Sequence, residues 1–592
     1  MFRRLSLCLF SFILMFSVVH SNDSMLRTSQ DVRVSKMLAK KHKSARLLIK
    51  LKPDNDLSYF SSHLITVRQK FPLDSFTTEE LRNAAREAGV DRWYVADLDS
   101  DSNMAMTMSE IIDQPEVEGV EPIYEAQLTD ITINKILPKA LVYAQGADPL
   151  FSEQWSLENN GQKGGLPGFD LRAKEFWQSI DKTPELQNTT LIHQLDSGID
   201  VDHPDIKNFP YTNKGEIPNN RIDDDHNGYV DDYNGYNSID DNGSLFDSVR
   251  HGTAVASVMG ATVDNGIGMK GLLGKLAGKN FFVLMSKFLT LTAGSYEDAG
   301  ESVIYGYKMG AKVTNHSWTG EYSQYVYDVF KMGELLGHIH VCAAGNKGMD
   351  TDAFFEYPAA FSFDPKHRLY NVIAVSSNNR FGALSKFSAF GSGIQISAPG
   401  EDIVCALANT SDYFVASGTS LSAPLVSVAI AVLINRNPER YYTLIMEDIL
   451  RLSRSHDTLE SKLQNANTLN VSRLLIREDA RLPLINNFKY IRKQSTSQSI
   501  YLKWQVPIND SNICSGIYGY ELRYSEKPWD QDDFEITSPV KFNPAPVSNA
   551  TQKQAWFIHG LRSKTGYFVG IRWRDSCGNL SPFSTIQAKT KK

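Results

Sequence analysis

The stretch GTSLSAP at residues 418–424 runs directly into the apolar stretch LVSVAIAVL at residues 425–433. A loop of small residues therefore delivers Ser420 onto the first turn of a long apolar helix. Unpaired backbone N–H groups and the positive end of the helix dipole face outward there. That position suits an oxygen nucleophile whose reaction builds negative charge beside it. Serine is also a common helix N-cap, so this segment alone leaves both interpretations open.

The region around this serine, residues 148–478, alternates apolar strand-like segments with helix-like segments. Such alternation favours an α/β fold, in which helices cover both faces of a parallel sheet. Ligand sites in these folds lie at the carboxyl ends of the strands. The expected strands are 190–195, 312–315, 338–344 and 369–376, and the expected helix is 252–262.

Three further segments place reactive side chains at strand and helix ends. One expected strand ends at Asp196, another ends near Asn346, and His251 starts the helix-like segment HGTAVAS. A serine nucleophile needs a base, and a histidine base needs a carboxylate to fix its tautomer and stabilise its cation. An asparagine amide can donate to a developing oxyanion, together with the backbone N–H of Ser420. Each motif alone is weak, because turns and solvated loops contain the same residues.

Taken together, these residues resemble the subtilisin-like serine peptidases. The resemblance covers nearly all of residues 148–478 and implies a doubly wound, mostly parallel sheet. It implies that Ser420 attacks a peptide carbonyl, that His251 takes and later donates the proton, that Asp196 orients His251, and that Asn346 stabilises the oxyanion. Ala254 replaces a second histidine that is usual in the family, at a position outside the triad. The matching motifs are LDSGIDVDHPDI (195–206), HGTAVAS (251–257), AAGN (343–346), FSAFG (387–391), ISAPG (396–400) and GTSLSAP (418–424).

The N-terminus has the pattern of a secretory signal peptide over residues 1–21. Arg3 and Arg4 precede an apolar stretch at residues 5–19, which is shorter than the roughly 20 residues of a membrane span. No later segment looks long and apolar enough to cross a bilayer, so we expect a secreted or extracytoplasmic protein. A net charge of −7 without a long basic run does not imply nucleic acid as a partner.

Residues 22–127 form a first unit, with an expected strand at 45–52 and an expected helix at 78–88. By resemblance, this unit is a small α+β propeptide that inhibits its own peptidase domain. Its last stretch, VEGVEPIYEAQL, is similar to the extended tail that lies in the family's active-site cleft before self-cleavage. We therefore expect a self-processing zymogen, cut after about residues 124–128 or further along the aperiodic linker 128–147.

The tail, residues 484–592, shows imperfect apolar/polar alternation and is expected to be an all-β sandwich of the fibronectin type III kind. Trp504 suits the core of such a sandwich, and Tyr567 suits its tyrosine corner. Cys514 and Cys577 fall in this tail, and export would allow a disulfide between them, although the four cysteines outside the signal permit three pairings. The other two, Cys342 and Cys405, lie in apolar strand-like runs and are expected to be buried. The expected strands of the tail are 500–504, 518–525 and 567–574.

The acidic stretch RIDDDHNGYVDD, at residues 221–232, predicts a calcium loop. Oxygen ligands at alternating positions with a glycine at the sixth place follow the pattern D-x-[DN]-x-[DN]-G. Asn234 stands where a twelfth-place glutamate is expected, and a solvated acidic loop remains the alternative. Calcium here would be structural, because the triad needs no metal. The expected ligands are Asp223, Asp225, Asn227, the Tyr229 carbonyl and Asp231.

By resemblance, the segment Ser317-Trp318-Thr319-Gly320 lines a cleft whose edge pairs with an extended protein or peptide substrate. The family often has glycine where Thr319 stands, which predicts a more crowded wall. Glu356 aligns near the floor of the primary pocket. We hypothesise a preference for a basic or polar side chain on the acyl side of the cut, and the alternative is a Glu356 that points to solvent.

Two functions of different classes remain. The first is a secreted serine endopeptidase made as a zymogen. The second is an exported binding protein, in which the β module acts and the peptidase fold is a scaffold. The presence of all four site residue types argues against a scaffold. Among enzymes, a dedicated processing protease is the alternative to a general degrader, and cleavage of casein or of one peptide sequence would separate the two.

Overall fold

The computed structural model describes residues 37, 42–55, 64–99, 102–129, 131–137, 148–181, 183, 186–438, 440–460, 462–464, 466–475, 484–505, 517–528, 553–575 and 581–592. The expected signal peptide and the expected Cys514–Cys577 disulfide lie outside these residues. The chain divides into two compact units. The first comprises Met1–Ala173, Pro184–Met446 and Ser455–Leu469, and the second comprises Lys174–Thr183, Glu447–Arg454 and Asn470–Lys592.

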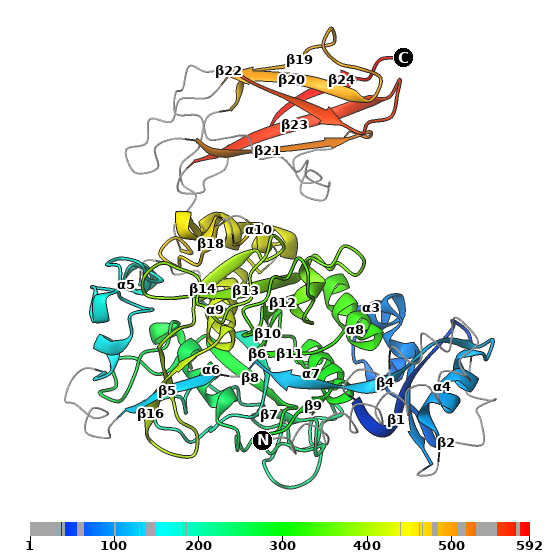
Figure 1. The fold of residues 1–592 in the computed structure, drawn as a ribbon, viewed down its shortest axis with the longest axis vertical. Helices are drawn as coiled ribbons and strands as arrows, with labels where there is room; N and C mark the ends of the chain where they lie inside the picture. Colours follow the sequence, from blue (N-terminus) through cyan, green and yellow to red (C-terminus); the bar gives the residue numbers. More distant parts are fainter. Residues whose placement is uncertain are drawn as a thin grey trace, which may run out of the picture. The chain divides into compact units, whose positions relative to one another are not determined.

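A parallel sheet forms the centre of the first unit, as Figure 1 shows. Its order is β17-β18-β14-β13-β12-β10-β6-β8-β7, where β17 is Arg454–Ser455, and every neighbouring pair from β18 to β7 is parallel. Four of these strands coincide with the strands expected from the sequence, so the expected α/β class is confirmed. The strands are β6 (Thr190–Asp196), β7 (Gly235–Asn237), β8 (Phe281–Lys287), β10 (Val313–His316), β12 (Ile339–Ala343), β13 (Val372–Asn378), β14 (Ile396–Pro399) and β18 (Asn467–Thr468).

Helices cover both faces of this sheet. Successive residues of a strand point to opposite faces, and on β10 the Asn315 side chain accepts from Ser427 of α9, whereas His316 packs on Phe330 of α8. By length and mean hydropathy (1.4) α9 could cross a membrane, which the sequence expectation missed, but 89% of it is buried inside the protein. The helices that cover the sheet are α6 (His251–Gly260), α7 (Tyr296–Lys308), α8 (Gln324–Leu335) and α9 (Thr419–Arg436), whereas α5 (Ala173–Ile180) and α10 (Tyr442–Leu452) fall partly or mostly in the second unit.

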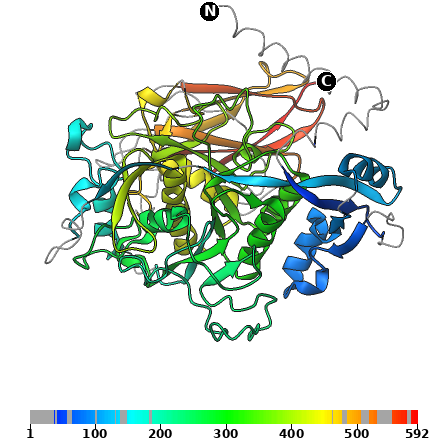
Figure 2. The same ribbon diagram turned by 60° about the horizontal axis from the view of Figure 1, so that its bottom comes forward.

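An antiparallel sheet precedes the parallel one in the chain, and two helices accompany it (Figure 2). The expected helix is α3, which Thr78 caps by accepting from Leu81 N at 3.2 Å and which ends at Gly89 with φ 74°. The last strand also pairs with β9 (Gly294–Ser295) and β11 (Trp318–Thr319). The elements are β1 (His42–Leu51), β2 (Leu64–Gln69), α3 (Glu79–Ala88), β3 (Trp93–Leu98), α4 (Met104–Ile112) and β4 (Val117–Leu128), in the sheet order β4-β1-β3-β2.

Part of the expected linker is a strand. β5 (Thr132–Leu137) pairs antiparallel with β16 (Tyr413–Ser417), which pairs on its other edge with β15 (Ile403–Ala406). Five of the six β5 side chains are exposed. Because backbone pairing and not alternate burial holds this strand, its sequence shows no periodicity.

The second unit contains two antiparallel three-stranded sheets, with the orders β19-β20-β22 and β21-β23-β24. Trp504 is buried in its core. The Tyr567 hydroxyl accepts from Arg562 N at 2.9 Å, which is the contact of a tyrosine corner. The strands are β19 (Asn486–Tyr490), β20 (Ser499–Gln505), β21 (Ile517–Ser525), β22 (Lys553–His559), β23 (Gly566–Asp575) and β24 (Ser584–Lys589).

Fully buried histidines line the face of the parallel sheet that α7 and α8 cover. His338 Nδ1 donates to the Ala311 carbonyl at 2.8 Å, so its Nε2 accepts from the Thr314 hydroxyl at 2.6 Å. Thr314 in turn accepts from His193 Nδ1 at 3.2 Å, and His193 Nε2 accepts from the Ser286 hydroxyl at 2.8 Å. Both rings are therefore satisfied as neutral imidazoles, which explains how a buried strand tolerates His193.

A second chain of bonds holds two more histidines. The Tyr307 hydroxyl donates to the Val329 carbonyl at 3.1 Å, so it accepts from His340 Nε2 at 2.9 Å. His340 Nδ1 then accepts from His316 Nε2 at 2.9 Å. Burial lowers the pKa of all four histidines, and the pKa of His338 falls to about 3.

These four histidines predict acid sensitivity. Below the usual histidine pKa of 6.5 the unfolded chain binds protons that the folded chain refuses, so stability falls as the pH falls below 6.5. Each histidine contributes a slope of up to about 1.4 kcal/mol per pH unit. We expect His338→Asn to reduce this slope by about one quarter of the four-histidine total in urea unfolding of the Ser420→Ala chain. The exposed His226→Asn is the control, and an equal slope in both variants would contradict the prediction.

Candidate active site

A carboxylate and an imidazole meet at the carboxyl end of the sheet. Asp196 is the last residue of β6, and His251 is the first residue of α6. Gly252 permits this approach, because a Cβ there would overlap the Gly198 carbonyl oxygen. His251 Nδ1 lies 2.7 Å from Asp196 Oδ1, and both side chains are buried. This is the geometry of a general base with a carboxylate that orients it.

The electrostatics of His251 suit a base. Burial by itself lowers the pKa of His251, but the charge of Asp196 and its hydrogen bond more than offset this, and the pKa is raised above 6.5. The charge of Asp247 and the carbonyl of Thr129 act in the same direction. Nε2 of His251 is buried and makes no hydrogen bond of normal geometry to the described residues. With Nδ1 donating to Asp196, Nε2 is the atom that can accept a proton.

Asp247 supports this pair, although no sequence pattern singles it out. It is buried, and it accepts from the Ser197 hydroxyl at 2.8 Å and from Arg250 N at 2.8 Å. Its other oxygen accepts from the backbone N–H of Thr253 at 2.9 Å and from the Thr253 hydroxyl at 2.7 Å. Asp247 thus ties the turn after Asp196 to the first turn of α6. Its only sequence signal is that aspartate is a common residue before helices.

Ser420 is the second residue of α9 and is buried. Its hydroxyl donates to the carbonyl oxygen of Thr129 at 2.5 Å. The same carbonyl raises the pKa of His251. The Ser420 hydroxyl and the His251 imidazole therefore both interact with the Thr129 carbonyl. The hydroxyl does not bond His251 Nε2 in this arrangement.

Asn346 follows β12 and is held by the residue before the serine. Its amide oxygen accepts from Thr419 N at 2.8 Å and from the Thr419 hydroxyl at 2.9 Å. Because Thr419 uses the amide oxygen, the NH₂ group is the part of Asn346 that can serve an oxyanion. Asn346 lines the same cavity as Thr129.

The end of β4 lies in this site as an added antiparallel strand. Gln127 and Leu128 pair with Thr319 and Trp318 of β11, and the next residue, Thr129, donates its N–H to the Ser317 carbonyl at 3.3 Å. Three of the four expected cleft residues therefore contact β4 through their backbones. The fourth, Gly320, exchanges two backbone hydrogen bonds with Tyr357 instead. The Trp318 side chain is buried against Phe288.

A cavity of about 210 Å³ lies beside Thr129. Glu356 lines this cavity and its side chain is only 15% exposed, so it does not point into solvent. Its carboxylate is paired with Lys347, which compensates its charge. The lining residues are Gln127, Leu128, Thr129, Thr132, Thr319, Asn346, Lys347, Glu356, Phe387 and Ser417.

Two of the expected calcium ligands also hold the backbone of the acidic loop. Asp223 accepts from the backbone N–H groups of Asn227 and Gly228, and Asp231 accepts from those of residues 220 and 221. Asp223 and Asp231 therefore brace the loop backbone. The expected ligand set stays a prediction, because an ionised carboxylate that accepts such hydrogen bonds keeps acceptor sites for a cation.

A different group of three carboxylates comes together instead. Oxygens of Glu216, Asp225 and Asp232 all lie within 4.8 Å of one another. Asn227 presents its amide NH₂ to Asp225 and Asp232, at 3.3 and 3.1 Å. No contact places the Tyr229 carbonyl in this group. Asp225 is the member of this group that the sequence also predicted as a ligand.

This cluster fits a hard divalent cation. Glu216 is 4% exposed, and its Oε2 is buried without a hydrogen-bond partner among the described residues. Burial raises the pKa of Asp232 to about 6, and the charge of Asp225 adds to this. Within the described part of the chain, no lysine or arginine forms an ion pair with any of the three. An oxygen-only set of this kind matches calcium chemistry.

Known proteins resemble this chain over its parallel-sheet region. The family model described as "Subtilase family" matches residues 187–472. The cell wall-associated protease of Bacillus subtilis is 28% identical over 315 residues, which are 53% of this chain and 31% of that protein. The major intracellular serine protease of the same bacterium is 29% identical over 284 residues, 47% of this chain and 77% of that protein. The chain thus spans about a third of the first relative's length.

Among solved structures, a protease of Pseudoalteromonas arctica has a TM-score of 0.42 and 20% sequence identity. It covers 56% of this chain and 99% of that one.

The acidic cluster predicts calcium-dependent stability. Calcium at 100 times its dissociation constant should stabilise the fold by about 2.7 kcal/mol. Glu216→Gln should remove most of that gain, because it removes the charge of a carboxylate whose Oε2 has no hydrogen-bond partner among the described residues. The measurement is the thermal midpoint of the Ser420→Ala chain with calcium and with a chelator. Asp231→Asn is the matched control: it should destabilise the loop but keep the calcium gain. If Asp231→Asn alone lost the stabilisation by calcium, the result would contradict the cluster of Glu216, Asp225 and Asp232 and favour the ligand set predicted from the sequence.

Proposed function

We propose that this chain is a serine endopeptidase that hydrolyses peptide bonds through Asp196, His251 and Ser420, since residues 187–472 match the family model described as "Subtilase family" and resemble known serine proteases. The observation that supports this most directly is the contact of the Ser420 hydroxyl with the Thr129 carbonyl oxygen, 2.5 Å away. That contact lies beside an imidazole that a buried carboxylate orients at 2.7 Å. A nucleophile, a base and a peptide carbonyl are thus in one place.

In the proposed reaction, Ser420 Oγ bonds to the carbonyl carbon and its proton passes to His251 Nε2. The carbonyl electrons move to the oxygen, which receives hydrogen bonds from the Asn346 NH₂ group and the Ser420 N–H. Asp196 stabilises the imidazolium. Breaking of the C–N bond then expels an amine, which takes the proton from His251. Water attacks the acyl-serine by the same route and frees the carboxylate.

We propose that the first substrate is the chain itself. The sequence placed the cut after about residues 124–128 or further along the linker, and the register of β4 favours the bond after Thr129. Thr129 is the residue whose carbonyl touches Ser420 and whose N–H bonds to Ser317. The residues before this bond would then be the inhibitory propeptide, and they would block the cleft as a bound product after the cut.

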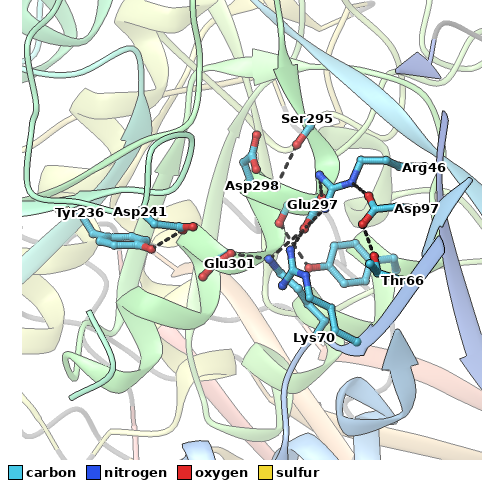
Figure 3. A network of polar contacts seen from close by, with 12 residues as sticks. Arg46, Thr66, Lys70, Asp97, Tyr236, Asp241, Ser295, Glu297, Asp298 and Glu301 are labelled. Carbon is cyan, nitrogen blue, oxygen red and sulfur yellow. Dashed lines mark hydrogen bonds and ion pairs between the residues drawn. The ribbon is translucent and has the colours of Figure 1, made fainter. Parts of the chain in front are cut away.

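Charge holds this proposed propeptide against the parallel-sheet region (Figure 3). Glu297, in the first turn of α7, has a side chain that is only 3% exposed. It forms ion pairs with Arg46 at 2.6 Å, with Arg68 at 2.9 Å and with Lys70 at 3.3 Å. Lys70 also pairs with Glu301. A basic face thus meets buried carboxylates, and breaking one such buried pair is costly.

The second attachment is at the N-terminus of α8. The Glu121 carboxylate accepts from the Ser323 hydroxyl at 2.5 Å, from Gln324 N at 3.0 Å and from Tyr325 N at 3.2 Å. A carboxylate from β4 therefore caps a helix of the other region, where the helix dipole favours negative charge. Burial raises the pKa of Glu121 to about 7. This cap supports a tight fit of the segment before the cut.

We propose a polar preference at the residue before the cut. Thr129 lies beside the cavity that Glu356 and Lys347 line. Lys347 neutralises the charge of Glu356. The electrostatic attraction of this cavity for a basic substrate residue is therefore weaker than that of an unpaired glutamate. A small polar side chain such as that of Thr129 fits both the size and the balanced charge of this cavity.

The proposal has three further parts. Calcium at Glu216, Asp225 and Asp232 would hold the acidic loop, and it takes no part in the chemistry. Residues 1–21 would direct secretion. Residues 484–592 would be a fibronectin type III-like module, supported by the tyrosine corner at Tyr567.

Self-cleavage gives the test of this function. The expressed chain should yield a fragment whose N-terminal sequence begins at Asp130, and Ser420→Ala should remain uncut because it lacks the nucleophile. Ser422→Ala is the matched control, since Ser422 is a buried serine of the same helix turn that bonds the Ala398 carbonyl. Identical processing of Ser420→Ala and the unmodified chain would contradict the proposal, and a cut elsewhere would contradict the register.

A further inference from the structure

The strand that follows the proposed cut is bound to a strand that leads to the nucleophile. β5 pairs antiparallel with β16, beginning with Thr132 opposite Ser417 and ending opposite Tyr413. β16 ends three residues before Ser420. Residues 132–137 therefore trace the course of a peptide on the carboxyl side of the reacting bond.

β5 is held in the manner of a bound peptide. Its backbone pairs with β16, and two side chains anchor it. The Asn134 amide donates to Asp402 at 2.6 Å and to the Ser417 hydroxyl at 2.7 Å. Leu137 is 2% exposed, whereas Ile136 is 54% exposed. Apart from Leu137, the strand contributes no buried side chain.

β16 can bind a peptide along only one of its edges, the edge that β5 occupies. The other edge of β16 is paired with β15. If β5 left, a row of backbone N–H and C=O groups beside the nucleophile would be unpaired, and such an edge binds an extended chain. The edge is also continuous with the course of β4, because β4 and β5 are joined through Thr129 and the two residues after it.

We infer that the β16 edge is a binding site for the substrate residues that follow the cut, as far as the eighth, where an apolar side chain is preferred. Leu137, the eighth residue after Thr129, shows which position is buried, and Asn134 shows where a hydrogen-bonding side chain fits. The ligand is an extended peptide. This inference rests on the proposed peptidase function and adds a subsite to it.

The chain's own residues 132–137 are the first occupant of this site, and they compete with later substrates. After the cut they remain covalently attached to the domain that carries β16. A tethered segment of this kind acts at an effective concentration on the order of millimolar. Long substrates should therefore gain no affinity from the β16 subsite of the processed enzyme until β5 is displaced.

Two substrates separate this subsite from the catalytic site. One is a peptide anilide that ends at the residue before the cut, and the other is a fluorogenic peptide with eight residues after the cut and leucine at the eighth. In processed Leu137→Asp, which loosens β5, we expect kcat/KM for the long peptide to rise about tenfold. The anilide rate should not change. Ile136→Asp, at an exposed neighbour on the same strand, is the control and should match the unmodified enzyme.

Asn134→Ala provides a second loosened strand without altering a buried position, so the test does not depend on the folding of Leu137→Asp. Replacing leucine by aspartate at the eighth position of the long peptide should abolish the gain in either variant. Equal long-peptide rates in all the proteins, with normal anilide hydrolysis, would overturn the inference alone. Failure of the processed, unmodified enzyme to hydrolyse the anilide would overturn the proposed function instead.

Discussion

The antiparallel pairing of β4 with β11 is the constraint on which the rest of the site depends. It fixes the register in which Gln127 and Leu128 lie beside Thr319 and Trp318, and this register brings the next carbonyl to Ser420. A shift by one residue would turn every side chain of the segment to the opposite face. One continuous stretch of chain, from β4 to β5, passes the triad, the cavity and the β16 edge. The three are therefore interpreted together as parts of one peptide-binding site.

Buried charge makes that register hard to lose. Glu297 and Glu121 have little access to water, and each is satisfied by groups on the far side of the contact between β4's sheet and the parallel-sheet region. If the contact opened, Glu297 would lose its cations and Glu121 its helix N-terminus. The buried histidines likewise depend on fixed partners, and both ring nitrogens of His338 are already used by Thr314 and the Ala311 carbonyl. Because burial lowers their pKa, the four histidines favour the folded state above pH 6.5.

The sequence predicted the chemistry of the site better than its geometry. Asp196, His251 and Ser420 were identifiable because each stands at the end or the start of an element with a strong local pattern. Glu216 and Asp232 were not predicted as metal ligands, because the acidic pattern describes spacing along the chain, whereas these two residues approach Asp225 through the folding of the loop. The sequence did not predict β5 as a strand, because pairing with a strand nearly 300 residues away leaves no periodicity in the sequence of β5.

The central claim is that the segment ending at Thr129 lies over Ser420 of the same molecule as a substrate. The half-time of self-cleavage, measured over a wide range of protein concentration after refolding, tests this claim most directly. An intramolecular cut from a preformed register predicts a half-time that does not change on dilution. A half-time that lengthens in proportion to dilution would mean that one molecule cuts another, and it would contradict the register that the structure describes.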